Sequence, residues 1–175
     1  PQFKYKTVLL APTGRAAKVM SAFAKKQAFT IHKKIYQAKK SIDAQMRFEL
    51  AANLHTNTVF LVDEASMIAD QGGSVISFGS GQRSLLDDLI QYVYSSKNCR
   101  LVFIGDIAQL PPVGSELSPA LDPQYLKRNF DLSLKGVELK TVVRQTEDSG
   151  ILWNATNLRE QLKEEKPRIQ FKTEG

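Results

Sequence analysis

Three groups of side chains in this sequence have types and spacings suited to chemistry on a phosphorylated substrate. The first is the acidic pair Asp63-Glu64, which follows the apolar run VFLV at 59–62. In such an arrangement the first carboxylate can hold Mg²⁺, and the second can position or deprotonate a water that attacks phosphorus. The same pair also fits a solvated helix start, where the helix dipole favours carboxylates. The pair alone leaves both interpretations open.

The second group lies in the segment VFIGDIAQLPPVG at 102–114. Gly105 permits a close backbone approach, and Asp106 follows an apolar run as Asp63 does. The amide of Gln109 could sense a terminal phosphate or hold a water. Taken by itself, the segment is better explained as a proline-terminated loop that Asp106 caps.

The third group is APTGRAAKVM at 11–20, where Gly14 resembles a phosphate-binding turn. A Walker A loop needs G-x-x-x-x-G-K-[ST], whose amides and lysine hold the phosphates, and the 175 residues contain no such pattern. The plain interpretation is a strand, a turn and a helix whose basic face carries Arg15 and Lys18.

The strands and helices that position these groups can be predicted from short apolar runs and helical periodicities. Strands are expected at 7–11, 58–62, 100–105 and 137–143, and helices from Thr13, from Thr30, over 84–94 and over 149–165. The helix at 84–94 carries a Ser84-x-x-Asp87 capping box. The first helix is expected to bury Phe23 in the core, with a stacking platform as the weaker alternative for this side chain. Residues 41–58 favour a small hairpin or an insertion, and 70–83 a loop.

Apolar strands that alternate with helices predict an α/β fold with a parallel sheet covered on both faces. Ligands of such sheets bind at the carboxyl ends of the strands. The rule places Thr13, Asp63, Glu64 and Asp106 near one another.

Composition narrows the classes of partner and compartment. The net charge is +6, and residues 1–47 carry eleven Lys or Arg against one acid, Asp43, so a polyanion is a plausible partner. The single Cys99 excludes an internal disulfide framework and fits a reducing, cytoplasmic compartment. Apolar runs are too short for a membrane span, for which about 20 residues are needed.

Taken together, these segments resemble RecD-like superfamily 1B DNA helicases, the family of the exodeoxyribonuclease V alpha subunit. The matching texts, in order, are APTGRAAKVM, TIHKKIY, VFLVDEASMI, GDIAQLPPVG and VVRQ, which look like motifs Ia to IV and cover roughly residues 6–159. The resemblance implies a RecA-like P-loop NTPase fold with three αβα layers. Residues 1–175 would form part of its first motor domain, 1A, with a small insertion at about 37–57.

The resemblance also implies roles for single residues. Asp63 would hold Mg²⁺, Glu64 would be the general base for ATP hydrolysis, and Gln109 would contact the γ-phosphate. Arg144 would reach the γ-phosphate as a finger, with Gln145 as a further nucleotide contact. Residues expected along a single-stranded DNA path are Pro12, Thr13, Arg15, Thr30 and His32. For His32, a partly buried histidine without a DNA contact is an equal alternative.

Departures from the family pattern add further expectations. The family's first strand and Walker A loop should precede Pro1, and its second motor domain should follow Gly175. Without a phosphate cradle, we expect this chain alone to bind ATP and Mg²⁺ weakly or not at all and to show no appreciable ATPase activity. The family's first strand lies inside the sheet, so we also expect open strand edges and self-association through them.

Two functions remain after these steps. The leading one is a fragment of an ATP-dependent DNA helicase or translocase in recombination or repair, with single-stranded DNA and other subunits of a recombination nuclease complex as partners. The alternative is a non-catalytic DNA-binding or scaffold module that keeps the fold without a P-loop. A GxxGxGK[ST] pattern upstream of Pro1 in the source gene would favour the first.

Overall fold

The computed structural model describes residues 5–40, 46–70, 84–109, 111–112, 115, 118–139, 150–161 and 170–171. The chain divides into two compact units, Pro1–Leu134 and Lys135–Gly175, which are treated separately below. None of the helices in these ranges is both long and apolar enough to cross a bilayer.

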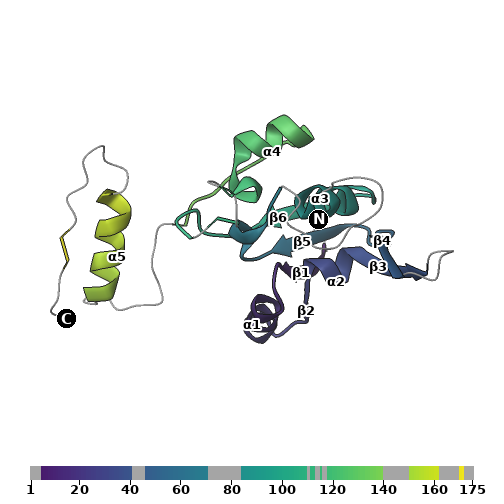
Figure 1. Ribbon diagram of the computed structural model, residues 1–175, viewed down its shortest axis with the longest axis horizontal. Coiled ribbons are helices and arrows are strands. Elements are labelled where there is room, and N and C mark those ends of the chain that lie inside the picture. The colour runs from purple at the N-terminus through teal and green to yellow at the C-terminus, as the bar shows by residue number, and fades with distance from the viewer. Residues whose placement is uncertain are drawn as a thin grey trace. The chain divides into compact units, whose positions relative to one another are not determined.

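A parallel sheet forms the centre of the first unit (Figure 1). Its strands are β1 (Lys6–Ala11), β2 (Ala28–Thr30), β5 (Thr58–Val62) and β6 (Arg100–Phe103), in the spatial order β2-β1-β5-β6. All three pairings are parallel. The runs predicted at 7–11 and 58–62 are confirmed as strands, and the run predicted at 100–105 is confirmed over 100–103. β2 was not predicted, because its three residues are too few to form a hydrophobic pattern.

Helices lie on both faces of this sheet (Figure 1). Helix α1 (Gly14–Ala24) packs on β1 and β2, whereas α2 (Ile31–Ile35) and α3 (Leu85–Tyr94) pack together on the opposite face. The helix starts expected at Thr13 and Thr30 are present, with each threonine capping its helix, and Ser84 forms the predicted capping box at α3. The predicted three-layer α/β fold is therefore confirmed.

The main core lies between the sheet and the α2–α3 layer. Leu10, Val62 and Phe103 are register neighbours on β1, β5 and β6, so one face of the sheet presents a continuous apolar surface. The largest fully buried apolar side chains are Phe60, Leu10, Ile31, Ile35, Ile68, Leu86 and Leu89. Burial on this scale fixes the directions in which the strand ends point.

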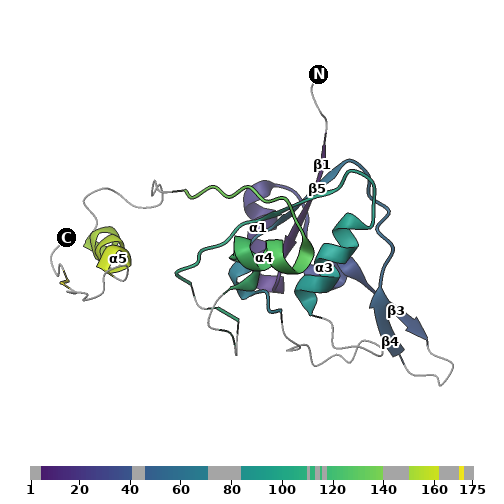
Figure 2. The same cartoon turned by 90° about the horizontal axis from the view of Figure 1, so that it is seen from above.

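An antiparallel hairpin extends from the end of α2 (Figure 2). It consists of β3 (Tyr36–Lys40) and β4 (Met46–Leu50), so the expected hairpin is present but starts before residue 41. The Tyr36 hydroxyl at its base donates to Asp88 Oδ2 of α3 at 2.7 Å. Burial and this contact raise the Tyr36 pKa, and Asp88 is only 4% exposed. The hydrogen bond attaches the hairpin to the core.

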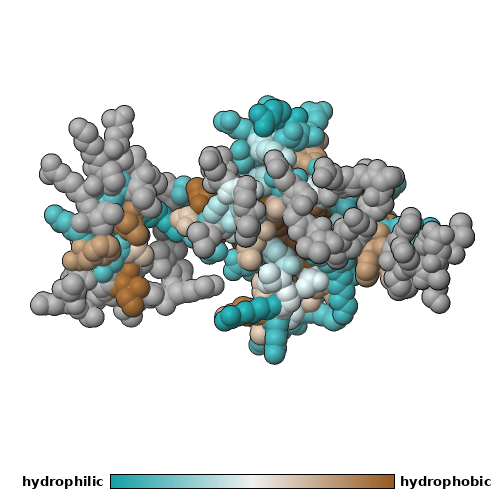
Figure 3. All heavy atoms as spheres, in the orientation of Figure 1, coloured by the Kyte–Doolittle hydropathy of each residue, from teal (hydrophilic) through white to brown (hydrophobic). Residues whose placement is uncertain are grey.

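Shorter elements complete the two units. The 3₁₀ turns η1 (Ala65–Met67) and η2 (Pro119–Leu121) contact each other, and α4 (Pro123–Phe130) follows η2. In the second unit, α5 (Gly150–Gln161) lies inside the predicted range 149–165. Its surface carries exposed hydrophobic side chains (Figure 3), with Ile151 71% exposed.

Two expectations were wrong within the described residues. Phe23 is 83% exposed instead of buried, because α1 turns its small residues to the sheet. There, Ser21 Oγ accepts from the Ala28 N–H at 2.8 Å, a contact that a large side chain would prevent. The strand expected at 137–143 is not formed at 137–139, where Val137 is 89% exposed, and its remainder lies outside the described residues.

Strand β6 has a partner on one side only in the described part of the sheet. Its Val102 is 40% exposed, and Ile104 just beyond the strand is 44% exposed. An apolar edge strand is a template for pairing with another chain. Self-association through this edge stays a prediction.

Candidate active site

The candidate residues lie along one edge of the sheet. All four strands are parallel, so their carboxyl ends lie at the same edge, where Thr30 ends β2 and Pro12, Asp63 and Ile104 follow β1, β5 and β6. Asp63, Glu64 and Gln109 follow β5 and β6, which are neighbours, and the DNA candidates lie at or after the ends of β1 and β2, also neighbours. At about 4.8 Å per strand, the edge from β2 to β6 is roughly 14 Å wide.

Asp63 sits where β5 ends and is held by two backbone contacts. Its own N–H donates to the Leu10 carbonyl at 3.0 Å, which continues the ladder one residue beyond the strand. Its Oδ1 accepts from the Glu64 N–H at 3.0 Å. The carboxylate is half-buried, with Oδ2 left to meet a cation or water.

Glu64 has a left-handed backbone, with φ 55° and ψ 37°. Four other non-glycine residues in the described ranges share this conformation: Lys25 and Asp131 end helices, while Asn57 and Asn98 precede β5 and β6. A left-handed backbone costs a glutamate roughly 1–2 kcal/mol. Among the described residues, Glu64 alone has this conformation at the carboxyl edge, where it immediately precedes η1.

The loops after β5 and β6 are joined through their backbones. The Ile104 N–H donates to the Val62 carbonyl at 2.8 Å, and the Ala65 N–H donates to the Ile104 carbonyl at 2.9 Å. At Gly105, a Cβ would lie 3.1 Å from the Ser66 nitrogen and 2.8 Å from Leu121 Cδ1. A side chain at 105 would therefore force these loops apart.

Beyond Gly105 the chain makes a tight turn that presents Gln109. Asp106 Oδ1 accepts from the Ala108 N–H at 3.0 Å, and the Asp106 carbonyl accepts from the Gln109 N–H at 3.1 Å. Asp106 thus stabilises its own loop. Gln109 is exposed and its amide is available to a ligand at this edge.

The threonines among the DNA candidates have a structural role as well. Thr13 Oγ1 accepts from the Ala16 N–H, and Thr30 Oγ1 accepts from the Lys33 N–H, both at 3.2 Å. A hydroxyl that accepts in this way still has its own proton to donate. Each cap can therefore also bind a phosphate oxygen.

The other DNA candidates differ in their exposure. Arg15 in the first turn of α1 is exposed, and Pro12 is half-buried. His32 is half-buried, burial lowers its pKa, and its ring lies 5.8 Å from the Tyr36 ring. It is a neutral, partly packed imidazole at neutral pH, which is compatible with either interpretation of His32.

Arg144 and Gln145, the expected finger and its neighbour, lie outside the described residues. Within those residues, no group of three or more His, Cys, Asp or Glu could hold a metal ion together. Magnesium commonly uses one or two carboxylates and takes its remaining ligands from water and substrate phosphates. The half-buried Asp63 carboxylate fits that donor set.

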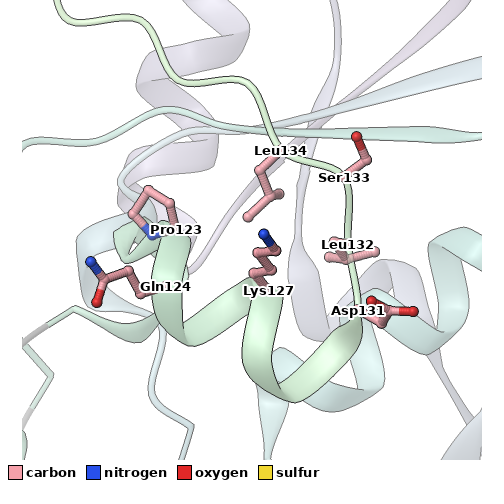
Figure 4. A pocket seen from close by; sticks show the side chains of 7 residues that line it. All are labelled: Pro123, Gln124, Lys127, Asp131, Leu132, Ser133 and Leu134. Atoms are coloured by element: carbon pink, nitrogen blue, oxygen red, sulfur yellow. The ribbon is translucent and has the colours of Figure 1, made fainter.

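A hollow of about 510 Å³ lies elsewhere, beside α4 (Figure 4). It is lined by α4 and the segment 131–134, with Lys127 and Asp131 as its charged side chains. None of the residues predicted to act on nucleotide or DNA lines it. The site proposed at the sheet edge is therefore separate from this hollow.

Comparison with known families agrees with this arrangement. Residues 2–115, which include every strand of the sheet and both joined loops, match the family described as AAA domain. The chain belongs to the AAA domain family. It is accordingly a P-loop NTPase domain of helicase type. A comparison with curated proteins gives no match.

Sequence reasoning missed the residues behind the site in this AAA domain. The Ser118 hydroxyl donates to the Ser66 carbonyl at 3.0 Å, and Leu121 packs against Gly105. Ser118 immediately precedes η2, and Leu121 ends it. Ser118 is 52 residues after Ser66 in the sequence. No local pattern marks such a long-range contact.

Proposed function

We propose that this AAA domain forms the part of an ATP-dependent DNA helicase or translocase that holds the hydrolytic carboxylates and the γ-phosphate sensor. The observation that carries the proposal is the junction of the two loops after β5 and β6. Asp63-Glu64 and Gln109 belong to loops that share the Ala65–Ile104 hydrogen bond and the close approach at Gly105. Groups on both loops can therefore act on one bound nucleotide.

Each residue has a distinct proposed role. The Asp63 carboxylate would hold Mg²⁺, which neutralises phosphate charge when it is bound. Glu64 would accept the proton of the attacking water as general base. Gln109 would donate its amide to the γ-phosphate, and its loop would move when that phosphate leaves. Arg144 and Gln145 remain proposed contacts of the same nucleotide.

Single-stranded DNA is the proposed partner along β1 and β2. The support is a basic, exposed Arg15 beside the Thr13 cap, and a second cap at Thr30 one strand away. Contacts of this kind address phosphates and not bases, so binding would be independent of sequence and sensitive to salt. A motor that moves along DNA needs such binding.

The finer family assignment rests on motif text. DEASM and GDIAQLPPVG in one chain resemble RecD-like helicases, so we propose a role in recombination or repair, together with other subunits of a nuclease complex. A cytoplasmic location is part of this proposal. The non-catalytic DNA-binding module is the alternative that the following experiment separates.

The test is DNA-stimulated ATP hydrolysis by the full-length gene product that contains this sequence. Glu64→Gln keeps size and polarity but removes the base, and we expect kcat to fall by about 100-fold or more, with single-stranded DNA binding retained. Glu49→Gln is the matched control, because Glu49 pairs with Lys39 on the hairpin, away from the edge. Hydrolysis that Glu64→Gln leaves unchanged contradicts the proposal.

DNA binding is measured by fluorescence anisotropy with labelled single strands at two salt concentrations. Arg15→Ala should weaken binding, and its effect should shrink as salt rises. Arg128→Ala, an exposed arginine on α4, is the control. Salt-sensitive binding without hydrolysis would favour the scaffold module, and no binding at low salt would argue against both functions.

A further inference from the structure

The serine that follows Asp63-Glu64-Ala65 is buried without a hydrogen bond for its hydroxyl. Ser66 is 0% exposed, and its Oγ has no partner among the described residues. It is the single buried side-chain oxygen or nitrogen of which this is true in the described ranges. Buried hydroxyls nearly always have a partner, so one without it needs a physical explanation.

The surroundings of Ser66 restrict that explanation. Its carbonyl accepts from the Ser118 hydroxyl at 3.0 Å, and the neighbouring η1 amides of Ala65 and Met67 donate to Ile104 and Glu64 carbonyls. The backbone around Ser66 is therefore fixed from several sides. By contrast, the Ser66 side-chain oxygen makes no hydrogen bond, although it lies in the turn that follows the candidate base Glu64.

The loop after β6 lies directly against this turn. A Cβ on Gly105 would come within 3.1 Å of the Ser66 nitrogen, so the backbone of Gly105 passes the backbone of Ser66 closely. The exposed Gln109 lies four residues further along the same loop. Because this loop touches the backbone of Ser66, a movement of the loop would change the surroundings of Ser66.

We propose that Ser66 is a positioning residue that couples the Asp63-Glu64 carboxylates to the Gly105–Gln109 loop. Its hydroxyl is without a partner in the arrangement described here and gains a hydrogen bond to that loop in the nucleotide-bound arrangement. An interaction present in one state only shifts the equilibrium between two states. This inference rests on the proposed function, because it assigns the coupling step at the same site.

The proposal predicts an unusual separation of stability from activity. Ser66→Ala removes a hydroxyl that makes no bond in the described arrangement, so Tm should be unchanged or higher. The DNA stimulation of kcat should fall by about fivefold or more, as expected for a lost coupling contact, with the KM for ATP within about twofold of wild type. Ser66→Ala also leaves a smaller side chain, so folding is not at risk from overpacking.

A second serine supplies the opposite pattern as a control. Ser84 is also buried, at 3% exposed, but its hydroxyl caps α3 by accepting from the Asp87 N–H at 3.0 Å. Ser84→Ala should lower Tm by several degrees, about 2–8 °C, and leave DNA stimulation unchanged. Both variants are measured in the full-length gene product by thermal unfolding and steady-state ATPase assays with and without single-stranded DNA.

The outcomes separate the coupling role from the proposed function. If wild type hydrolyses ATP and Ser66→Ala shows the same DNA stimulation, the coupling role is wrong and the proposed function stands. A Tm that falls with Ser66→Ala as far as with Ser84→Ala also overturns it, since the hydroxyl then has a structural partner. Wild-type protein without any Glu64-dependent hydrolysis overturns both the proposed function and the coupling role.

Discussion

Replacement of Gly105 by alanine tests the junction between the two loops directly. The added methyl would lie 2.8 Å from Leu121 Cδ1, 3.1 Å from the Ser66 nitrogen and 3.3 Å from the Ala65 nitrogen. Ordinary contacts between such atoms are longer than 3.4 Å. The leucine methyl can rotate away, but the two nitrogens belong to backbone that hydrogen bonds hold in place.

The cost of this replacement follows from those distances. Forcing one extra methyl into a packed site costs about 1–3 kcal/mol, and here the displaced groups are part of the η1 turn. The Ala65–Ile104 hydrogen bond is the first contact that a shift would lengthen, and a bond of this kind contributes about 1 kcal/mol. We therefore expect Gly105→Ala to lower the free energy of unfolding by about 1–3 kcal/mol.

The assay is urea unfolding of the 175-residue chain, followed by circular dichroism, with Gly14→Ala as the matched control. Gly14 begins α1, and a Cβ there meets nothing within 4 Å. The same substitution should stabilise the chain there by roughly 0.4–1 kcal/mol, because alanine restricts the unfolded chain. If the same substitution lowers the free energy of unfolding at Gly105 and raises it at Gly14, the loss at Gly105 is specific to the junction of the two loops.

One result would refute this reasoning. If Gly105→Ala is as stable as wild type while Gly14→Ala behaves as expected, the loops after β5 and β6 do not lie against each other as described. The joint action of Glu64 and Gln109 on one nucleotide would then lose its structural basis.

Three further predictions concern the elements that hold the edge. Thr13→Ala should cost about 1 kcal/mol in urea unfolding through loss of the α1 cap, whereas Thr13→Ser should recover most of it. Tyr36→Phe removes a donor to the buried Asp88 carboxylate and should cost about 1.5–3 kcal/mol; an unchanged midpoint would mean that the hairpin is not attached there. Burial lowers the pKa of His32 and His55, so these neutral side chains contribute to the free energy of unfolding above pH about 6.5, and the contribution is lost as pH falls. Between pH 7.5 and pH 5.5, roughly one unit either side of that value, the double His→Gln variant should lose less free energy of unfolding than wild type does. An equal loss in the two proteins would contradict this prediction.

The sequence predicted the parts of the fold that local patterns encode. Val59–Val62 is apolar throughout and is a buried strand, and the capping box of Ser84 and Asp87 opens α3. Such features depend on neighbours in sequence, which a pattern can capture. The alternation of strands and helices then sufficed to predict the parallel sheet and the edge at which the candidate residues lie.

The errors have physical causes that a pattern cannot capture. Phe23 has the right spacing for a buried face, but close packing of α1 on β2 selects Ala17 and Ser21 for that face instead. The three residues of β2 form a strand only because β1 lies beside them. Likewise, Ser118 reaches Ser66 across 52 residues, so the contact depends on the completed fold.

At the candidate site, residue types were predictable and geometry was not. Asp63, Glu64 and Gln109 could be named from motif text, and the topology brings their loops together as the carboxyl-end rule predicts. The left-handed backbone of Glu64 and the unpartnered hydroxyl of Ser66 could not be predicted, because both depend on the conformation and surroundings of η1 in the folded chain.

The central claim is that Asp63, Glu64 and Gln109 act together on one nucleotide at the carboxyl edge of the sheet. Its most direct test is a crystal structure of the full-length gene product with Mg²⁺ and a non-hydrolysable ATP analogue. We predict the metal beside Asp63, with the terminal phosphate between Glu64 and the Gln109 amide. A nucleotide bound elsewhere, for example in the hollow beside α4, would contradict the claim.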